Sequence, residues 1–296
     1  MNLLRTRIIA GLAFLLLPVA GIGMAGAARA EVPEPATTEP APPEPAPIEP
    51  VPAEQAAPSP AALYAEGAYA EAVAAALALG DAHGDAGMDA LAARALLAQA
   101  RLAPRGERAG LVGRALEAAR RAVARDPQHL EGNLQLALAL GYQGRAMGNL
   151  AAHQRGLAEE ARAAIDTALA VAPDNPWAQA LLGSWHVEIV TGAGPLLAAT
   201  LYGASLDEGL KAFRAAEAHP EVSLLVLHQM ALHLLSYDSR SFARQAERML
   251  MAARARDAGT HFERHMARQA DRLLRALRSG SHAMLAREIE RERLTF

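Results

Sequence analysis

The sequence predicts an all-α fold made of stacked antiparallel helical hairpins. From residue 61 onward, apolar and small residues recur at the i, i+3, i+4 and i+7 spacing of amphipathic helices, and no run alternates with the period of two that a strand requires. An alanine-rich helical phrase that ends in proline also recurs, at Pro127, at Pro173 and more loosely at Pro220. These prolines are 46 and 47 residues apart. Such a near-constant period is typical of helical repeat arrays, in which each hairpin buries its apolar face against its neighbours.

Residues 1–30 predict a secretory signal peptide. Arg5 and Arg7 form a positive start, an apolar stretch follows, and Ala28 and Ala30 are small residues at the two positions that a signal peptidase reads. An uncleaved anchor is the alternative, because apolar and small residues continue for about the 20 positions that span a bilayer. Both interpretations export the rest of the chain, so we expect a periplasmic protein or one anchored in the membrane and facing the periplasm.

Residues 31–60 predict a disordered Pro/Glu-rich linker. This stretch holds 11 of the 18 prolines, six glutamates and no basic residue. Such a composition cannot bury a core and favours extended polyproline II. We expect a tether; a proline motif that binds a partner is the alternative.

The remaining chain is electrically neutral overall, since residues 61–296 carry 26 basic and 26 acidic side chains. Basic residues exceed acidic ones only from Arg240 onward, as expected for a surface that faces anionic lipid or an acidic partner, or for solvated helix faces. They are not interleaved with aromatic residues, so we expect no nucleic-acid partner. The absence of cysteine excludes disulfides and thiolate metal sites.

Helices are expected to begin and end near prolines and glycines, which suit helix ends and first turns. Taken in order, the expected helices cover residues 61–79, 88–103, 108–125, 129–143, 157–172, 176–190, 205–218, 222–236, 239–257, 260–279 and 282–293. They form a helical repeat domain over 61–280 and a C-terminal helix or tail over 281–296.

The recurring phrase resembles the second helix of a tetratricopeptide repeat. Ala161, Ile165, Ala168 and Pro173 match its small, bulky, small and proline positions. The resemblance implies a right-handed superhelix of about five hairpins. The sequence departs from the pattern in its longer period, compared with about 34 residues in that repeat, and the extra length falls around residues 145–156 and 191–205.

A second resemblance concerns these prolonged hairpins. Trp177-x7-Trp185, the run Leu201-Tyr202-Gly203-Ala204-Ser205 and the phrase Leu210-x2-Phe213-x-Ala215 are similar to the regulator of microtubule dynamics family and its bacterial relatives, over Glu160 to Arg278. The resemblance implies a tetratricopeptide-like helical domain of adaptor type. It transfers no catalytic residues to this chain.

Candidate sites for chemistry are few. His261-x3-His265 places two imidazoles on one helix face, but two neutral ligands make half a tetrahedral zinc site, and we expect an exposed helical pair rather than a metal site. Trp177, Leu181 and Trp185 form a stripe that we assign to the core, with a partner-binding pocket as the alternative. No Gly-x-Ser-x-Gly nucleophile motif occurs. No cofactor or metal is expected.

The apolar insert that follows this stripe, Thr191 to Tyr202, predicts a glycine hinge and then a short helix with one apolar face. It either caps the array or offers an apolar surface to a partner or a membrane.

The fold therefore predicts a non-catalytic, envelope-associated adaptor that binds a protein or peptide partner in its groove. An envelope hydrolase acting on peptidoglycan or peptide, and a peripheral membrane protein that uses residues 194–202, are the alternatives. The residues expected to contact a partner are polar or amphipathic groups near first-helix and insert positions: Arg114, Arg121, Gln135, Arg145, Asn149, His186, Glu188 and Tyr202.

Overall fold

Successive helices pack against one another as hairpins throughout the computed structural model, which describes residues 57–293. The predicted signal peptide and nearly all of the predicted linker lie outside these residues. Two helices, α1 (Pro60–Glu66) and α2 (Tyr69–His83), come first. The five hairpins that follow within the described residues are α3 (Ala86–Leu102) with α4 (Arg105–Arg125), α5 (Leu130–Met147) with α7 (Leu157–Val171), α8 (Pro176–Ala193) with α10 (Leu206–Ala218), α11 (Leu224–Asp238) with α12 (Ala243–Arg254), and α13 (His261–Arg278) with α14 (His282–Arg293).

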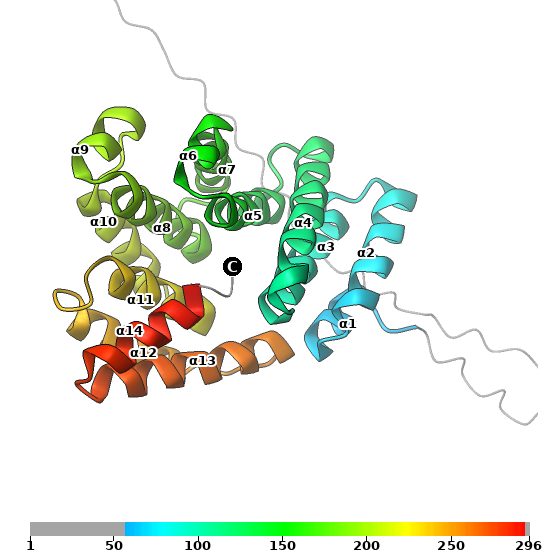
Figure 1. The fold of residues 1–296 in the computed structure, drawn as a ribbon. Helices are drawn as coiled ribbons and strands as arrows, with labels where there is room; N and C mark the ends of the chain where they lie inside the picture. Colours follow the sequence, from blue (N-terminus) through cyan, green and yellow to red (C-terminus); the bar gives the residue numbers. More distant parts are fainter. Residues whose placement is uncertain (1–56, 294–296) are drawn as a thin grey trace, which may run out of the picture. The chain divides into compact units, whose positions relative to one another are not determined.

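The first helices of the hairpins form an inner layer. Each of α3, α5, α8, α11 and α13 contacts the next in that order, and α4, α7, α10 and α12 each pack against the first helix of their own hairpin. In Figure 1, α7 and α10 lie on the outer side of α5 and α8. Helix α1 also contacts α13, so the two ends of this array meet. The all-α prediction is confirmed for the described residues, which contain no strand. The right-handed sense of the stack and its likeness to tetratricopeptide repeats stay predictions.

A side-chain cap begins every helix of the inner layer. The side chains of Asp85, His129, Asn175, Ser223 and Thr260 each accept a hydrogen bond from a backbone N–H in the first turn that follows. These caps satisfy N–H groups that a helix start leaves without partners. The last of them is a complete capping box with a glutamate. These capping residues therefore determine where the helices of the inner layer begin.

Small residues allow the paired helices to approach closely. Ala115, Ala119 and Ala122 of α4 are fully buried, and this helix packs against both α3 and α5. Where α8 and α10 cross, a Cβ added to Gly183 would lie 2.3 Å from the ring of Phe213. Phe213 is itself fully buried. The glycine is thus required by packing rather than by its backbone angles.

The expected helix boundaries fail mainly at glycines. The first expected helix is two helices, because Gly67 adopts a left-handed φ of 93° and ends α1. Conversely, Gly192 is helical inside α8, and the break comes at Gly194, which has a φ of 79°.

The two long connections contain additional short helices. The first holds α6 (Asn149–Gln154), and the second holds α9 (Pro195–Leu197) and the π-helical turn η1 (Ala198–Tyr202). None of the described helices combines the length and the apolar character needed to cross a membrane.

We predict that Gly183→Ala destabilises the domain by about 1–3 kcal/mol, the usual cost of overpacking, because its methyl group collides with Phe213 and with the carbonyl oxygen of Gly209. The matched control is Gly141→Ala, in the interior of α5, where an added Cβ meets nothing within 4 Å. That change is expected to be neutral or to stabilise by up to about 1 kcal/mol through helix propensity. Urea unfolding of the two variants decides, and equal effects would contradict the packing argument.

Candidate binding cavities and a buried ion-pair network

The inner helices enclose a central cavity of about 250 Å³. Its wall is mainly apolar, with polar side chains from several of the helices. Residues that line it include Leu97, Leu134, Leu138, Trp177, Leu181, Leu225 and Met266, together with Arg94, Arg101, Gln135, Ser184 and Gln229. An apolar hollow with a few convergent polar groups is the usual form of a binding site.

An ion pair between neighbouring hairpins lies on the wall of the central cavity. Arg94 of α3 donates through Nε to Oε1 of Glu131, 2.8 Å away, and the same oxygen accepts from the side-chain amide of Gln135 at 2.8 Å. Nearby, burial raises the pKa of the Tyr64 phenol, against the opposing effect of Arg94. This rim therefore presents a charged pair and a neutral phenol beside an apolar wall.

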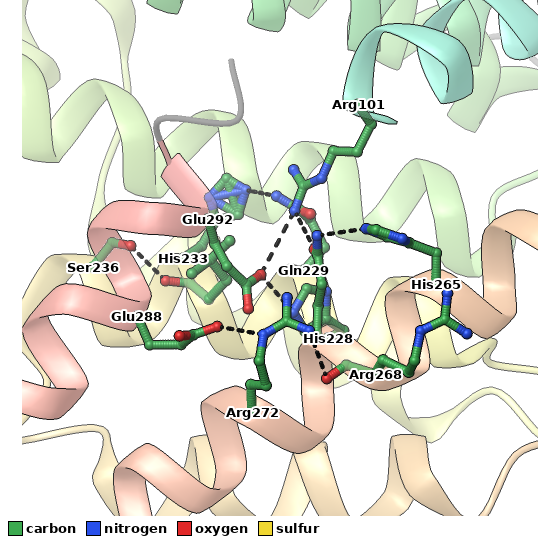
Figure 2. A network of polar contacts seen from close by, with 12 residues as sticks. Arg101, His228, Gln229, His233, Ser236, His265, Arg268, Arg272, Glu288 and Glu292 are labelled. Atoms are coloured by element: carbon green, nitrogen blue, oxygen red, sulfur yellow. Dashed lines mark hydrogen bonds and ion pairs between the residues drawn. The ribbon is translucent and has the colours of Figure 1, made fainter. Parts of the chain in front are cut away.

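A buried ion-pair network lies beside the cavity and joins hairpins that are far apart in the sequence (Figure 2). Glu292 of α14 places Oε2 2.8 Å from Nε2 of His228 and 3.6 Å from a guanidinium nitrogen of Arg101. All three side chains are at most 2 % exposed. Arg101 also donates to Oε1 of Gln269 at 3.0 Å. The network thereby links α3, α11, α13 and α14.

The charges in this network are mutually dependent. Burial opposes ionisation of Glu292, but His228, Arg101 and Arg272 outweigh it and hold the pKa of Glu292 below its ordinary value. Burial likewise lowers the pKa of Arg101, partly offset by Glu292. A buried charge without its partner is strongly destabilising. Removal of either charge therefore takes away a counter-charge on which the other depends in the interior.

A second cavity of about 100 Å³ adjoins the network. Glu188 of α8 forms an ion pair with Arg145 of α5 and lies 3.5 Å from Nδ1 of His233. Burial, opposed in part by Glu188, lowers the pKa of His233 to about 4. The imidazole is therefore neutral at physiological pH, and Arg145 is the cation that balances Glu188.

The two long connections border a third cavity of about 300 Å³. The hydroxyl of Tyr202 is 2.5 Å from Nδ1 of His153, and the amide of Asn149 donates to the carbonyl oxygen of Gly192 at 3.3 Å. The first contact joins the two connections to each other, and the second joins the first connection to α8. Trp185 also lines this third cavity, and its indole N–H donates to the carbonyl oxygen of Ala158 at 2.8 Å.

Several of the residues expected to bind a partner lie together in the structure. Arg145, Asn149 and Glu188 line both the second and the third cavity, and Tyr202 lines the third. Gln135 lines the central cavity.

Three other expected contact residues lie elsewhere. His186 is buried, and its Nδ1 accepts the backbone N–H of Ser205 at 3.2 Å. Arg121 forms an ion pair with buried Asp89, and Arg114 is exposed on α4. Neither of these arginines lines the three cavities.

The histidine pair on α13 differs from its expected exposure. His261 and His265 are both half-buried. Nδ1 of His261 is 3.1 Å from the hydroxyl of Tyr69, and Nε2 of His265 is 2.9 Å from the side-chain nitrogen of Gln269. Within the described residues no three His, Asp or Glu side chains are grouped so as to hold a metal ion.

Two histidine–acid pairs are close enough for acid–base chemistry, yet their surroundings do not suit it. His228 and Glu292 are buried, and a carboxylate that also pairs with an arginine is a weak base. Nε2 of His233 faces the side-chain nitrogen of Gln229 at 3.1 Å. The nearby hydroxyl of Ser236 donates to the carbonyl oxygen of Leu232 instead. Both histidine–acid pairs thus belong to ion-pair and hydrogen-bond contacts beside the cavities.

The fold and these cavities define an all-helical domain of stacked hairpins that surround internal cavities. A family model described as regulator of microtubule dynamics protein 1-3 matches residues 63–278. That match covers most of the chain, which therefore belongs to this family. A comparison with curated proteins found no match.

We predict that the free energy of unfolding falls as the pH is lowered from about 6.5 to about 4. His233 is neutral in the folded chain over this range because burial lowers its pKa to about 4, whereas the unfolded histidine takes up a proton near pH 6.5. One such group contributes at most about 1.4 kcal/mol per pH unit. Urea unfolding at pH 7, 6 and 5 should show a shallower dependence for His233→Gln than for the native chain. Identical slopes would exclude this assignment.

Proposed function

We propose that the protein is an exported, non-catalytic adaptor that holds a segment of a protein partner in its central cavity. The proposal of export rests on the predicted signal peptide and linker. The observation that carries the proposed binding function is the apolar cavity between the inner helices, with Gln135 and Ser184 among the polar groups on its wall. Helical arrays use the surface formed by their inner helices for partners. The buried histidine–acid pairs described above give no comparable support to a hydrolase.

Filling the cavity tests the adaptor function directly. Ser184 is a small, half-buried residue of α8 on the cavity wall, so Ser184→Phe is expected to fill the cavity while leaving the helix intact. The matched control is Ala163→Phe, at an exposed position on α7.

The measurement is a crosslinking pull-down from intact cells with each full-length variant as bait. We expect one envelope protein to be recovered with the native chain and with the control, and its yield to fall at least tenfold with Ser184→Phe. Equal recovery with all three baits would place the partner outside the cavity. No specific protein with any bait would overturn the adaptor function.

A second candidate function is contact with a membrane, and one observation favours it. Leu196, Leu197 and Leu201 are 79 %, 52 % and 58 % exposed, while Ala198 of the same segment is buried against the core. The connection therefore does not hide its leucines as a cap would. Leu150 of α6, 72 % exposed, borders the same cavity as Leu201. Exposed leucines on adjacent connections suit insertion at a lipid interface.

Vesicle flotation separates this function from the first. If the leucines enter the interface, the double variant Leu196→Glu with Leu201→Glu should lose at least tenfold in binding to phosphatidylglycerol vesicles. Leu79→Glu, at another exposed leucine on α2, is the control and should bind like the native chain. Absence of native binding to anionic and neutral vesicles alike would remove this candidate.

A further inference from the structure

Helix α14 contacts the rest of the domain through one narrow face. Its buried residues are Leu285, Ile289 and Glu292, at positions i, i+4 and i+7. Glu288, at i+3, is 13 % exposed and accepts from Nε of Arg272 at 3.0 Å. The other side chains of the helix are exposed. This is the pattern by which an amphipathic helix binds in a groove.

The surface under α14 matches that face residue by residue. Leu285 and Ile289 join the apolar cluster formed by α11, α12 and α13. Glu292 lies between Arg101 and His228, as Figure 2 shows. This surface, which we call the α14 seat, therefore recognises two aliphatic side chains one turn apart, followed by a carboxylate in a buried basic site.

The seat and its occupant differ in their relation to the family. Arg101, His228 and Arg272 lie within residues 63–278, which the family model matches. Helix α14 begins at His282, after the matched region. The seat is thus built entirely from the family domain, whereas the helix that fills it comes from the segment that follows.

The end of α14 also lies where two cavities meet. Arg101 and Gln229 line both the central cavity and the second cavity, and Glu292 and Arg293 line the second. Withdrawal of α14 would remove part of the wall of the second cavity. It would also leave Arg101 without the Glu292 carboxylate, which is unfavourable unless another carboxylate replaces it.

We propose that the α14 seat is the recognition site for a partner helix and that α14 is its intramolecular competitor. The partner has aliphatic residues at i and i+4 and carboxylates at i+3 and i+7, because these are the groups that the seat binds in α14. The inference rests on the proposed adaptor function and specifies the chemistry of the partner. Binding then requires exchange of one acidic helix for another.

The test uses the full chain and a fluorescent peptide with the sequence of residues 281–293. Glu292→Lys places a cation beside Arg101 and should release α14 from its seat. The matched control is Glu290→Lys, the same charge change at an exposed position of the same helix. We expect the peptide to bind Glu292→Lys at least tenfold more tightly than the control, and a peptide with lysine at the position of Glu292 to lose that gain. Equal affinity in the two folded variants overturns the proposal.

A second version leaves Glu292 unchanged, in case its replacement prevents folding. A protease site inserted after Gly280, in the exposed turn before α14, allows the helix to be cut while both pieces remain. The labelled peptide should then replace the cut helix, and failure to exchange shows that α14 is a permanent part of the core. Dimer formation by the cut chain shows that the occupant is a second copy, which also overturns the proposal.

The outcome is independent of the pull-down. Peptide exchange with no protein recovered from cells would leave the seat established and the adaptor function refuted. Recovery of a partner without peptide exchange would support the adaptor function and refute the role of the α14 seat.

Discussion

The buried contact between Arg101 and Glu292 is the constraint on which the arrangement of the hairpins depends. Arg101 belongs to the first hairpin and Glu292 to the last described turn, and the two meet with hardly any exposed surface. Two charges are tolerated there only because each neutralises the other and because His228 and Gln269 complete their contacts. A shift of α14 by one turn would break the pair, so the network fixes the register of the last helix against the first hairpin.

The cavities follow from the way in which the hairpins close around this network. Because α1 contacts α13, the inner helices face one another across an enclosed space rather than along an open groove. Alanines at the helix crossings keep the hairpins close, and the few large side chains are left to line the interior. Trp177 and Trp185 are two of these large side chains: they lie on one helix, yet they line different cavities.

Local signals in the sequence were sufficient for the helices and insufficient for the site. Amphipathic periodicity and proline spacing predicted every helix of the five hairpins, because each helix buries a face of its own. The assignment of Trp185 to the core was correct, whereas Trp177 is only half-buried. Several helix boundaries were predicted wrongly at glycines, since Gly192 is helical while Gly67 and Gly194 are not. Glycine adopts positive and negative φ about equally readily, so its presence alone does not mark a helix end.

The long-range contacts had no such signal. The importance of Arg101 and Glu292 depends on a meeting of residues 191 positions apart, which no periodicity encodes. The same reason explains why His261 is half-buried, for its neighbour Tyr69 comes from the opposite end of the domain. Arg145 and Glu188 were predicted to contact a partner because they lie near first-helix and insert positions, and that prediction stands untested. Their ion pair with each other was not predicted.

The wide separation of Arg101 and Glu292 along the chain has a consequence for biosynthesis. An open repeat array can fold hairpin by hairpin as it is made, since each unit needs only its neighbours. Here the first hairpin contains a buried arginine whose carboxylate partner is made 191 residues later. Until then Arg101 must stay hydrated, which keeps the interior open to water. Closure of the domain around Arg101 therefore waits until α14 has been made.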